Sequence, residues 1–215
     1  MRLILISDTH GLHHQLAPLP DGDVLVHAGD ITNRGAPGEV AEFFGWFGGR
    51  PHRHKVMIAG NHDFLFEREP ARAEAMVPPG VTYLRDAGVT IDGVRFWGSP
   101  WQPWFHDWAF NLERGEELAA KWALIPADTE VLVTHGPPHR MLDETMNRPP
   151  QVVGCEALAA RLTELPGVRL HVFGHIHEGY GRVQRDGREY VNASICDVRY
   201  RPVNPPVIVD LVAAP

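Results

Sequence analysis

"RLILISDTH", residues 2–10, is an uninterrupted apolar run that ends in an aspartate and a histidine. A run without polar alternation is typical of a strand buried on both faces, as in a sheet that is covered on both sides. Runs of the same kind recur along the chain, as DVLVHAG (23–29), HKVMIAG (54–60), EVLVTHG (130–136) and RLHVFGH (169–175). Each of these runs therefore predicts a buried strand.

Segments with helical spacing lie between the apolar runs. They are GEVAEFFGWF (38–47), RGEELAAKWALI (114–125) and CEALAARLTEL (155–165), and each places its apolar residues on one helix face. Further short strands and turns are predicted at residues 81–99, 188–194 and 206–211. Strands that alternate with helices predict an α/β fold, here with two packed mixed β-sheets and helices outside. Because no Ser/Gly-rich linker interrupts the chain, we expect residues 1–215 to form a single domain.

The composition excludes several classes of protein. The hydrophobic fraction of 44% is ample for a buried core, and the net charge of -7 argues against strong binding to a nucleic-acid backbone. No apolar run approaches the roughly 18–20 residues that a membrane helix needs. The opening residues turn polar too soon for a signal peptide, and Cys155 and Cys196 read as reduced thiols. We therefore expect a cytoplasmic protein that does not enter the membrane.

Metal-ligating side chains follow every one of the buried runs. These ligand candidates are Asp8, His10, Asp30, Asn61, His135, His175 and His177. Ligands bind at the carboxyl ends of strands in α/β sheets, so we expect these side chains to meet there. The set exceeds what one ion can use and suits two ions that share a bridging carboxylate. Mixed nitrogen and oxygen ligands without thiolate favour Mn, Fe, Zn, Co or Mg, and paired ions typically clamp a phosphoryl group.

The order of the motifs resembles a known family. Asp-x-His, Gly-Asp, Gly-Asn-His-Asp, His-Gly and Gly-His-x-His follow one another across residues 8–177, as in the calcineurin-like metallophosphoesterase superfamily. The stretches THGPP, FGHIHEGYG and VNASICDVRYRPVNPPVIVDL are similar to its metallophosphoesterase-domain-containing branch, which is related to class III cyclic nucleotide phosphodiesterases. The resemblance implies a four-layer αββα sandwich.

The resemblance also implies roles for the ligand candidates. One divalent ion, with Mn²⁺ expected first and Fe, Zn, Co or Mg as alternatives, has the ligands Asp8, His10, Asp30 and His177. The ligands of the second ion are Asp30, Asn61, His135 and His175. His62 binds no metal in this scheme but protonates the leaving group or donates to a phosphoryl oxygen, and Asp63 orients His62 and stabilises its charge. Asp63 has an alternative or additional role as the cap of the helix that follows it.

The activity that follows is hydrolysis of a phosphoester by hydroxide generated at the metals. Cyclic nucleotides or similar phosphodiesters are the expected substrates, and a small-molecule phosphoester, including a nucleotide, is the expected partner. A phosphomonoesterase or protein phosphatase, and a nucleotide-binding regulator with weak residual activity, stay as alternatives.

Other residues near the motifs have less specific readings. Residues 99–111 carry five aromatic side chains, which form either a packed loop over the sheet or a wall for a purine base. Arg34 and Arg140 are surface arginines or phosphate clamps. His13 and His14 are interpreted as loop histidines at the rim, and residues 192–206 as a connector laid across the sheet.

Overall fold

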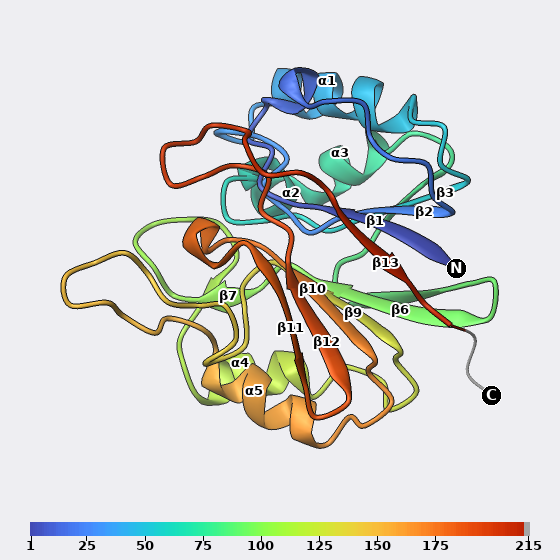
Figure 1. Ribbon diagram of the computed structural model, residues 1–215. Helices are drawn as coiled ribbons and strands as arrows, with labels where there is room; N and C mark the ends of the chain where they lie inside the picture. Colours follow the sequence, from blue (N-terminus) through green and yellow to red (C-terminus); the bar gives the residue numbers. More distant parts are fainter. Residues whose placement is uncertain (213–215) are drawn as a thin grey trace.

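Two β-sheets face each other in the computed structural model, which describes residues 1–212 (Figure 1). The first sheet has five strands in the order β13-β1-β2-β3-β4, spanning Val207–Asp210, Arg2–Ile6, Val24–His27, His54–Met57 and Val81–Tyr83. The second has six in the order β11-β12-β10-β9-β6-β5, spanning Gly181–Arg185, Arg188–Asn192, Leu170–Phe173, Val131–Thr134, Val94–Ser99 and Ala87–Ile91. Two short strands, β7 (Gln102–Pro103) and β8 (Asn111–Leu112), form a separate two-stranded sheet.

Helices cover the outer face of each sheet (Figure 1). The helices over the first sheet are α1 (Pro37–Gly48), α2 (Phe64–Arg68) and α3 (Pro70–Ala75). Those over the second sheet are α4 (Glu116–Trp122) and α5 (Glu156–Thr163). Two short 3₁₀ turns, η1 (His13–Gln15) and η2 (His177–Gly179), follow the first and last of the predicted buried runs. The predicted architecture of two mixed sheets flanked by helices is confirmed.

Both faces of the central strands are buried, which explains their unbroken apolar sequences. In β1, Leu3 and Leu5 face the core between the sheets, where they join Val133 of β9 and Val172 of β10. The alternate residues of β1 contribute to a second core, which also contains Phe43 of α1. Alternate side chains along a strand point to opposite faces, so every position of a strand between two cores is buried and favours an apolar residue.

Parallel pairing brings the ends of distant strands together. β1, β2 and β3 run parallel in the first sheet, as do β9, β10 and β12 in the second. An isolated parallel bridge between Ser7 and Ser194 joins the two sheets just beyond β1 and β12. The carboxyl ends of these strands therefore meet at one edge of the sandwich.

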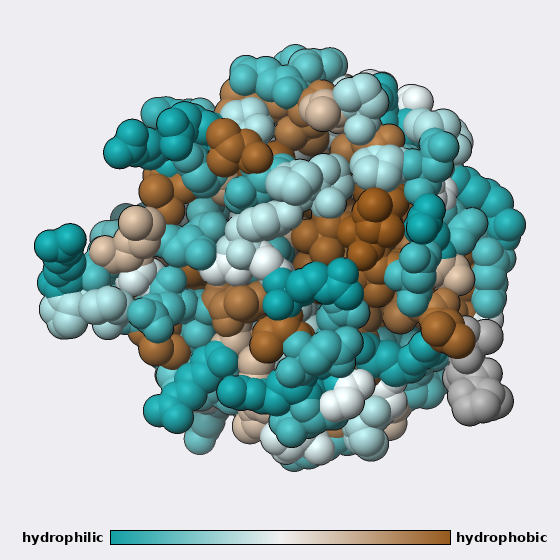
Figure 2. All heavy atoms as spheres, viewed as in Figure 1, coloured by the Kyte–Doolittle hydropathy of each residue, from teal (hydrophilic) through white to brown (hydrophobic). Residues whose placement is uncertain are grey.

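Figure 2 shows the molecule in the view of Figure 1. Hydrophilic surface dominates its periphery, and hydrophobic surface lies between the two sheets where β13 runs. Among residues 1–212, no helix has the length and apolar character needed to cross a bilayer.

Candidate metal centre

The seven ligand candidates from the sequence converge at the edge where the strands end. β1 leads to Asp8 and His10, β2 to Asp30, and β3 to Asn61. The remaining candidates follow β9 and β10 in the second sheet. Asp8 and His135 are fully buried, and Asp30 is only 2% exposed. The site is therefore built between the two sheets and is screened from solvent.

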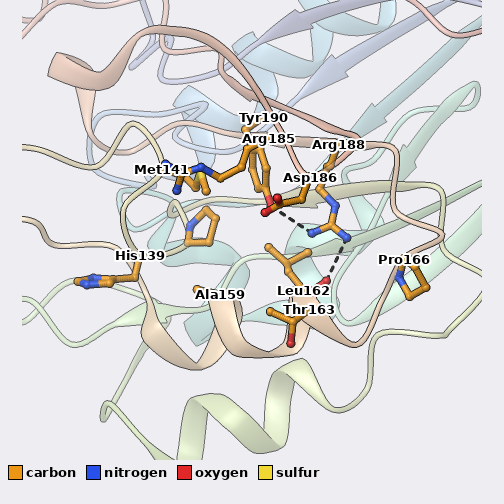
Figure 3. Close-up of a pocket in the computed structure, with 11 residues that line it drawn as sticks. His139, Met141, Ala159, Leu162, Thr163, Pro166, Arg185, Asp186, Arg188 and Tyr190 are labelled. Atoms are coloured by element: carbon orange, nitrogen blue, oxygen red, sulfur yellow. Dashed lines mark hydrogen bonds between the residues drawn. The ribbon is translucent and has the colours of Figure 1, made fainter.

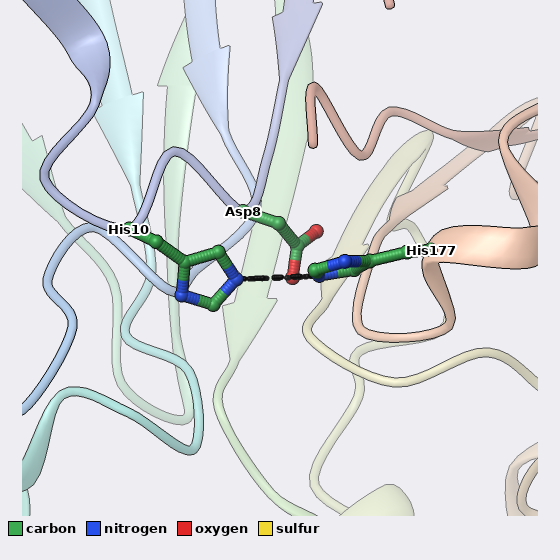
Figure 4. A group of neighbouring side chains, drawn as sticks. All are labelled: Asp8, His10 and His177. Carbon is green, nitrogen blue, oxygen red and sulfur yellow. Dashed lines mark hydrogen bonds and ion pairs between the residues drawn. The ribbon is translucent and has the colours of Figure 1, made fainter. Parts of the chain in front are cut away.

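The first group of ligands surrounds a common point (Figure 4). His10 Nε2 lies 3.2 Å from His177 Nε2 and 4.0 Å from Asp8 Oδ1. His177 Nε2 lies 3.5 Å from the same Asp8 oxygen. Atoms that bind one ion at about 2.0–2.2 Å lie roughly 2.8–3.6 Å from one another when they are adjacent, and up to about 4.4 Å when they are on opposite sides of the ion. The spacing of this group fits one divalent ion.

The second group is centred on the amide of Asn61. Its Oδ1 atom lies 2.9 Å from His135 Nε2 and 2.8 Å from His175 Nδ1. Asp30 Oδ2 lies 3.4 Å from His135 Nε2 and 3.8 Å from His10 Nε2. Asp30 is thus the carboxylate that stands between the two groups, as expected of a bridging ligand.

The electrostatics of the ligand set favour cations. Burial raises the pKa of Asp8, but the contact with and charge of His177 outweigh it and hold that pKa below its ordinary value. Burial alone would lower the pKa values of His135 and His177. The charge of Asp30 raises the pKa of His135 to about 9, and the contact with Asp8 raises the pKa of His177 to about 9. Without metal, two histidines therefore stay protonated to offset two buried carboxylates. Bound divalent ions can neutralise these carboxylate charges in place of the protons.

Backbone carbonyls fix which ring nitrogen faces the centre. His135 Nδ1 donates to the Ala28 carbonyl at 2.9 Å, and His177 Nδ1 donates to the Asp197 carbonyl at 2.9 Å. Each bond leaves Nε2 as the atom that faces the other ligands. His10 Nδ1 is buried and has no hydrogen-bond partner in the described part of the chain.

The backbone at the site is bent in a way that few residues tolerate. Asp8, His10, Asp30 and His175 all have left-handed φ angles, between 44° and 67°. Such residues cost about 1–3 kcal/mol each and cluster at functional sites. The close packing at Gly174 also excludes any side chain, because an added Cβ would lie 2.0 Å from Asp8 Oδ2.

His62 lies beside the ligand groups with its ring in a defined orientation. Its Nδ1 atom donates to the Asn33 carbonyl at 2.7 Å, and Nε2 points toward Asp30 Oδ2 at 3.9 Å. The Trp108 ring covers it, with ring centroids 4.2 Å apart. Nε2 is therefore the atom of His62 that can serve a bound substrate.

Asp63, which is expected to orient His62, makes no hydrogen bond to the His62 ring in the described part of the chain. The Asp63 carboxylate instead accepts from the main-chain N–H groups of Gly60, Ile31 and Thr32 at 2.8–3.2 Å. The capping role is also wrong, because the Asp63 side chain makes no cap hydrogen bond to α2. Asp63 joins the loops that carry Asp30 and His62, and burial followed by the charge of Asp30 raises its pKa to about 6.

Two contributors escaped the sequence analysis, and both come from the segment read as a connector. Ser194 Oγ donates to Asp8 Oδ2 at 2.8 Å. Tyr200 packs its ring against His10, with centroids 4.7 Å apart, and against His177. Neither residue belongs to a ligand motif. The available signals were the position of this segment after a predicted strand and its place in a stretch similar to the metallophosphoesterase-domain-containing branch.

Cavities open on both sides of the ligand cluster. The one on the His62 side has a volume of about 600 Å³, with Arg34, His62, Phe64, Arg68, Trp108 and Tyr200 among its lining residues. The one on the His175 side has a volume of about 360 Å³ and includes Trp104, Phe105, Arg114, Gly136, His175 and Glu178. The aromatic stretch at 99–111 is thus divided: Phe110 is buried in the core, while Trp104, Phe105 and Trp108 line cavities. Arg140 lines neither cavity.

A further cavity of about 380 Å³ lies away from this edge, between α5 and the β11–β12 hairpin (Figure 3). Arg188 in its wall donates to the Leu162 carbonyl at 3.0 Å and to the Tyr190 hydroxyl at 3.1 Å. Because this guanidinium is occupied by bonds within the protein, the cavity is not an obvious anion site.

Comparison with known proteins agrees with the fold. The family model of the calcineurin-like phosphoesterases matches residues 1–179. Metallophosphoesterase domain-containing protein 1 of Homo sapiens is 44% identical over 232 residues, covering 98% of this chain and 71% of the relative, and the Mus musculus protein matches equally. The UPF0046 protein C25E10.12 of Caenorhabditis elegans is 34% identical, covering 100% of this chain and 82% of the relative.

These matches and the ligand groups indicate a metal-dependent phosphoester hydrolase, the class for which this sandwich and its strand-end ligands are suited. Within that class, the chain belongs to the calcineurin-like phosphoesterase family.

Proposed function

We propose that this protein is a dinuclear metal-dependent phosphodiesterase that acts on cyclic nucleotides or similar phosphodiesters. The observation that carries the proposal is the position of Asp30 between two groups of ligands, with His62 beside it. Asp8, His10, Asp30 and His177 hold one ion in this scheme, and Asp30, Asn61, His135 and His175 hold the other. Mn²⁺ is the ion that we propose first. Two bound divalent ions supply Lewis acidity to the phosphoryl group and a nucleophile at neutral pH.

The residues of the chain then orient the substrate and move one proton. His62 presents Nε2 to the site because its Nδ1–H is engaged by the Asn33 carbonyl. A protonated Nε2 can donate to the oxygen of the leaving group as the ester bond breaks. Arg34 and Arg68 line the adjoining cavity, where a guanidinium can pair with a phosphate oxygen. Asp63 acts as a positioning residue, since it holds the His62 loop to the Asp30 loop.

Cavities on both sides support a diester over a monoester. A phosphodiester carries two substituents, and each can leave the ligand cluster along a separate cavity. The cavity beside His62 has aromatic walls, including Phe64 and Trp108, against which a nucleobase can stack.

A substrate panel tests the proposal. The protein is loaded with Mn²⁺ and assayed with bis-p-nitrophenyl phosphate, p-nitrophenyl phosphate, and 2′,3′- and 3′,5′-cyclic nucleotides. We expect turnover of the diesters to exceed that of the monoester. Turnover of the monoester alone would indicate a phosphomonoesterase or protein phosphatase. Tight nucleotide binding with negligible turnover of every ester would indicate a nucleotide-binding regulator.

A further inference from the structure

His13 is an unusual buried histidine outside the metal centre. It begins η1, shortly after His10, and only 1% of its surface is exposed. Neither Nδ1 nor Nε2 has a hydrogen-bond partner within residues 1–212. Buried polar groups are nearly always paired, and an unpaired one costs about 1–3 kcal/mol. The expectation of a loop histidine at the rim is therefore wrong for His13, and its unpaired nitrogens need another explanation.

Two further metal-ligating side chains lie next to it. His14 Nε2 is 3.3 Å from Glu42 Oε1 of α1. One ligand atom from each of His13, His14 and Glu42 lies within 4.8 Å of the others. His14 and Glu42 are 57% and 59% exposed in their side chains, so both can rotate to close these distances.

We propose that His13, His14 and Glu42 form a separate binding site for a divalent transition metal ion, of which Zn²⁺ is the best match. Two imidazoles and one carboxylate are a donor set that Zn²⁺ accepts, with a fourth position open to water. The proposal does not depend on the phosphodiesterase assignment, because none of these residues belongs to the dinuclear ligand groups.

The surroundings of His13 prepare it as a ligand. Its ring packs against Trp46, with centroids 5.0 Å apart, and against Phe43 at 5.7 Å. Burial, followed by the charge of His14, lowers its pKa to about 4, so the ring is neutral and has a free lone pair at neutral pH. A cavity of about 330 Å³ is lined by His13, His14 and Trp46 among others.

One nearby charge opposes a cation. Arg50 lines the same cavity, with its guanidinium 5.0 Å from the Trp46 ring centroid and its Nε donating to the Trp46 carbonyl at 3.0 Å. Its removal should therefore tighten metal binding. A bound ion would also join η1 to α1 and so restrain the loop that leads back to His10.

Equilibrium dialysis against Zn²⁺, with elemental analysis of the full chain, tests this site. We expect Glu42→Gln and His14→Gln each to bind one Zn²⁺ fewer than the unmodified protein, or to hold that ion at least about tenfold more weakly. Glu74→Gln on the exposed side of α3 is the matched control and should bind as the unmodified protein does. Arg50→Gln should bind the ion several-fold more tightly.

Equal stoichiometry and affinity in Glu42→Gln, His14→Gln and the unmodified protein would overturn the proposal. The test is a difference between variants, so it remains decisive whatever number of ions the dinuclear centre binds. If the protein has no dinuclear centre, the unmodified protein and all variants bind fewer ions by the same number. If the His13 site does not exist, the Glu42 and His14 variants bind as many ions as the unmodified protein.

Discussion

At the scale of single residues, the orientation of His62 supports the proposal that it donates a proton and does not bind a metal. Its Nδ1–H is held by a main-chain carbonyl and its Nε2 faces Asp30 without belonging to either ligand group in our assignment. A substitution at this position can therefore remove a proton donor while the ligands stay in place.

We expect His62→Asn to keep the metal content of the unmodified protein but to lose about 10²–10⁴-fold in kcat with an alkyl phosphodiester. The loss should be much smaller with an aryl ester such as bis-p-nitrophenyl phosphate, because p-nitrophenolate leaves without a proton. Elemental analysis and steady-state kinetics with both esters provide the measurement. An equal loss with both leaving groups would contradict a role in protonation.

Protons and metals compete for two of the histidines. In the metal-free protein the pKa values of His135 and His177 are both about 9, because Asp30 and Asp8 outweigh the effect of burial. Both values lie above the ordinary 6.5, so protonation stabilises the metal-free fold fully below pH 6.5. This contribution is lost as the pH rises through 9.

Metal binding must displace these protons, so we expect metal affinity to increase as the pH rises from 6 to 9. The limit is about a tenfold decrease in apparent Kd per pH unit for each proton displaced. Calorimetric titration with Mn²⁺ in buffers of different ionisation enthalpy measures both the affinity and the protons released. An affinity that does not change over this range would show that the two rings are already neutral.

At the scale of elements, the turn that follows β10 depends on a residue without a side chain. Gly174 lies so close to the β1 loop that an added Cβ would be 2.0 Å from Asp8 Oδ2 and 2.2 Å from Ser7 Oγ. We expect Gly174→Ala to lower the free energy of unfolding by about 1–3 kcal/mol and to weaken metal binding at least about tenfold. Denaturant unfolding and metal titration provide the measurements.

Gly38→Ala is the matched control for this substitution. An added Cβ at Gly38, within α1, meets nothing within 4 Å. Because alanine favours a helix over glycine, this variant should be about 0.5–1 kcal/mol more stable. If both alanine variants behaved alike, the close approach at Gly174 would not be what requires glycine there.

The regular elements were predictable because their signals are local. The run at 2–7 predicted β1, and the apolar face at 38–47 predicted α1, each within a residue or two of its observed bounds. The helix expected after Asp63 is divided at Glu69, because Pro70 starts a new helix and cannot continue the old one.

The contacts that complete the site were not predictable in this way. Ser194 reaches Asp8 across 186 residues of chain, and the carbonyls of Ala28, Asn33 and Asp197 carry no residue-specific signal. The actual partners of the Asp63 carboxylate are the Thr32 hydroxyl and three main-chain N–H groups, and any sequence offers the latter. Metal ligands can be predicted from residue type, whereas the hydrogen bonds that orient them depend on tertiary structure.

At the scale of the whole molecule, the centre joins two sheets that also share one core. Asp8 and Asp30 come from the first sheet, and His135 and His177 from the second. Bound metal should therefore stabilise the contact between the sheets. We further propose that residues 1–215 fold as one domain, since neither sheet can bury its inner face without the other.

Removal of metal with a chelator should lower the midpoint of thermal unfolding while the transition stays single. At a free-metal concentration of about 100 Kd, binding adds about 2.7 kcal/mol, which corresponds to a shift of roughly 5–11 °C for a chain of this size. Differential scanning calorimetry with and without EDTA measures both features. Two separate transitions would contradict a single domain, and an unchanged midpoint would contradict metal binding to the native state.

The pairing of β13 with β1 has a consequence for how the protein is made. Arg2 pairs with Asp210 in the register of these strands, 208 positions apart. The ribosome therefore completes β1 long before it synthesises β13. Until β13 is made, the edge of β1 that it will cover is free to pair with a wrong strand, so chaperones that shield this edge should help the nascent chain to fold.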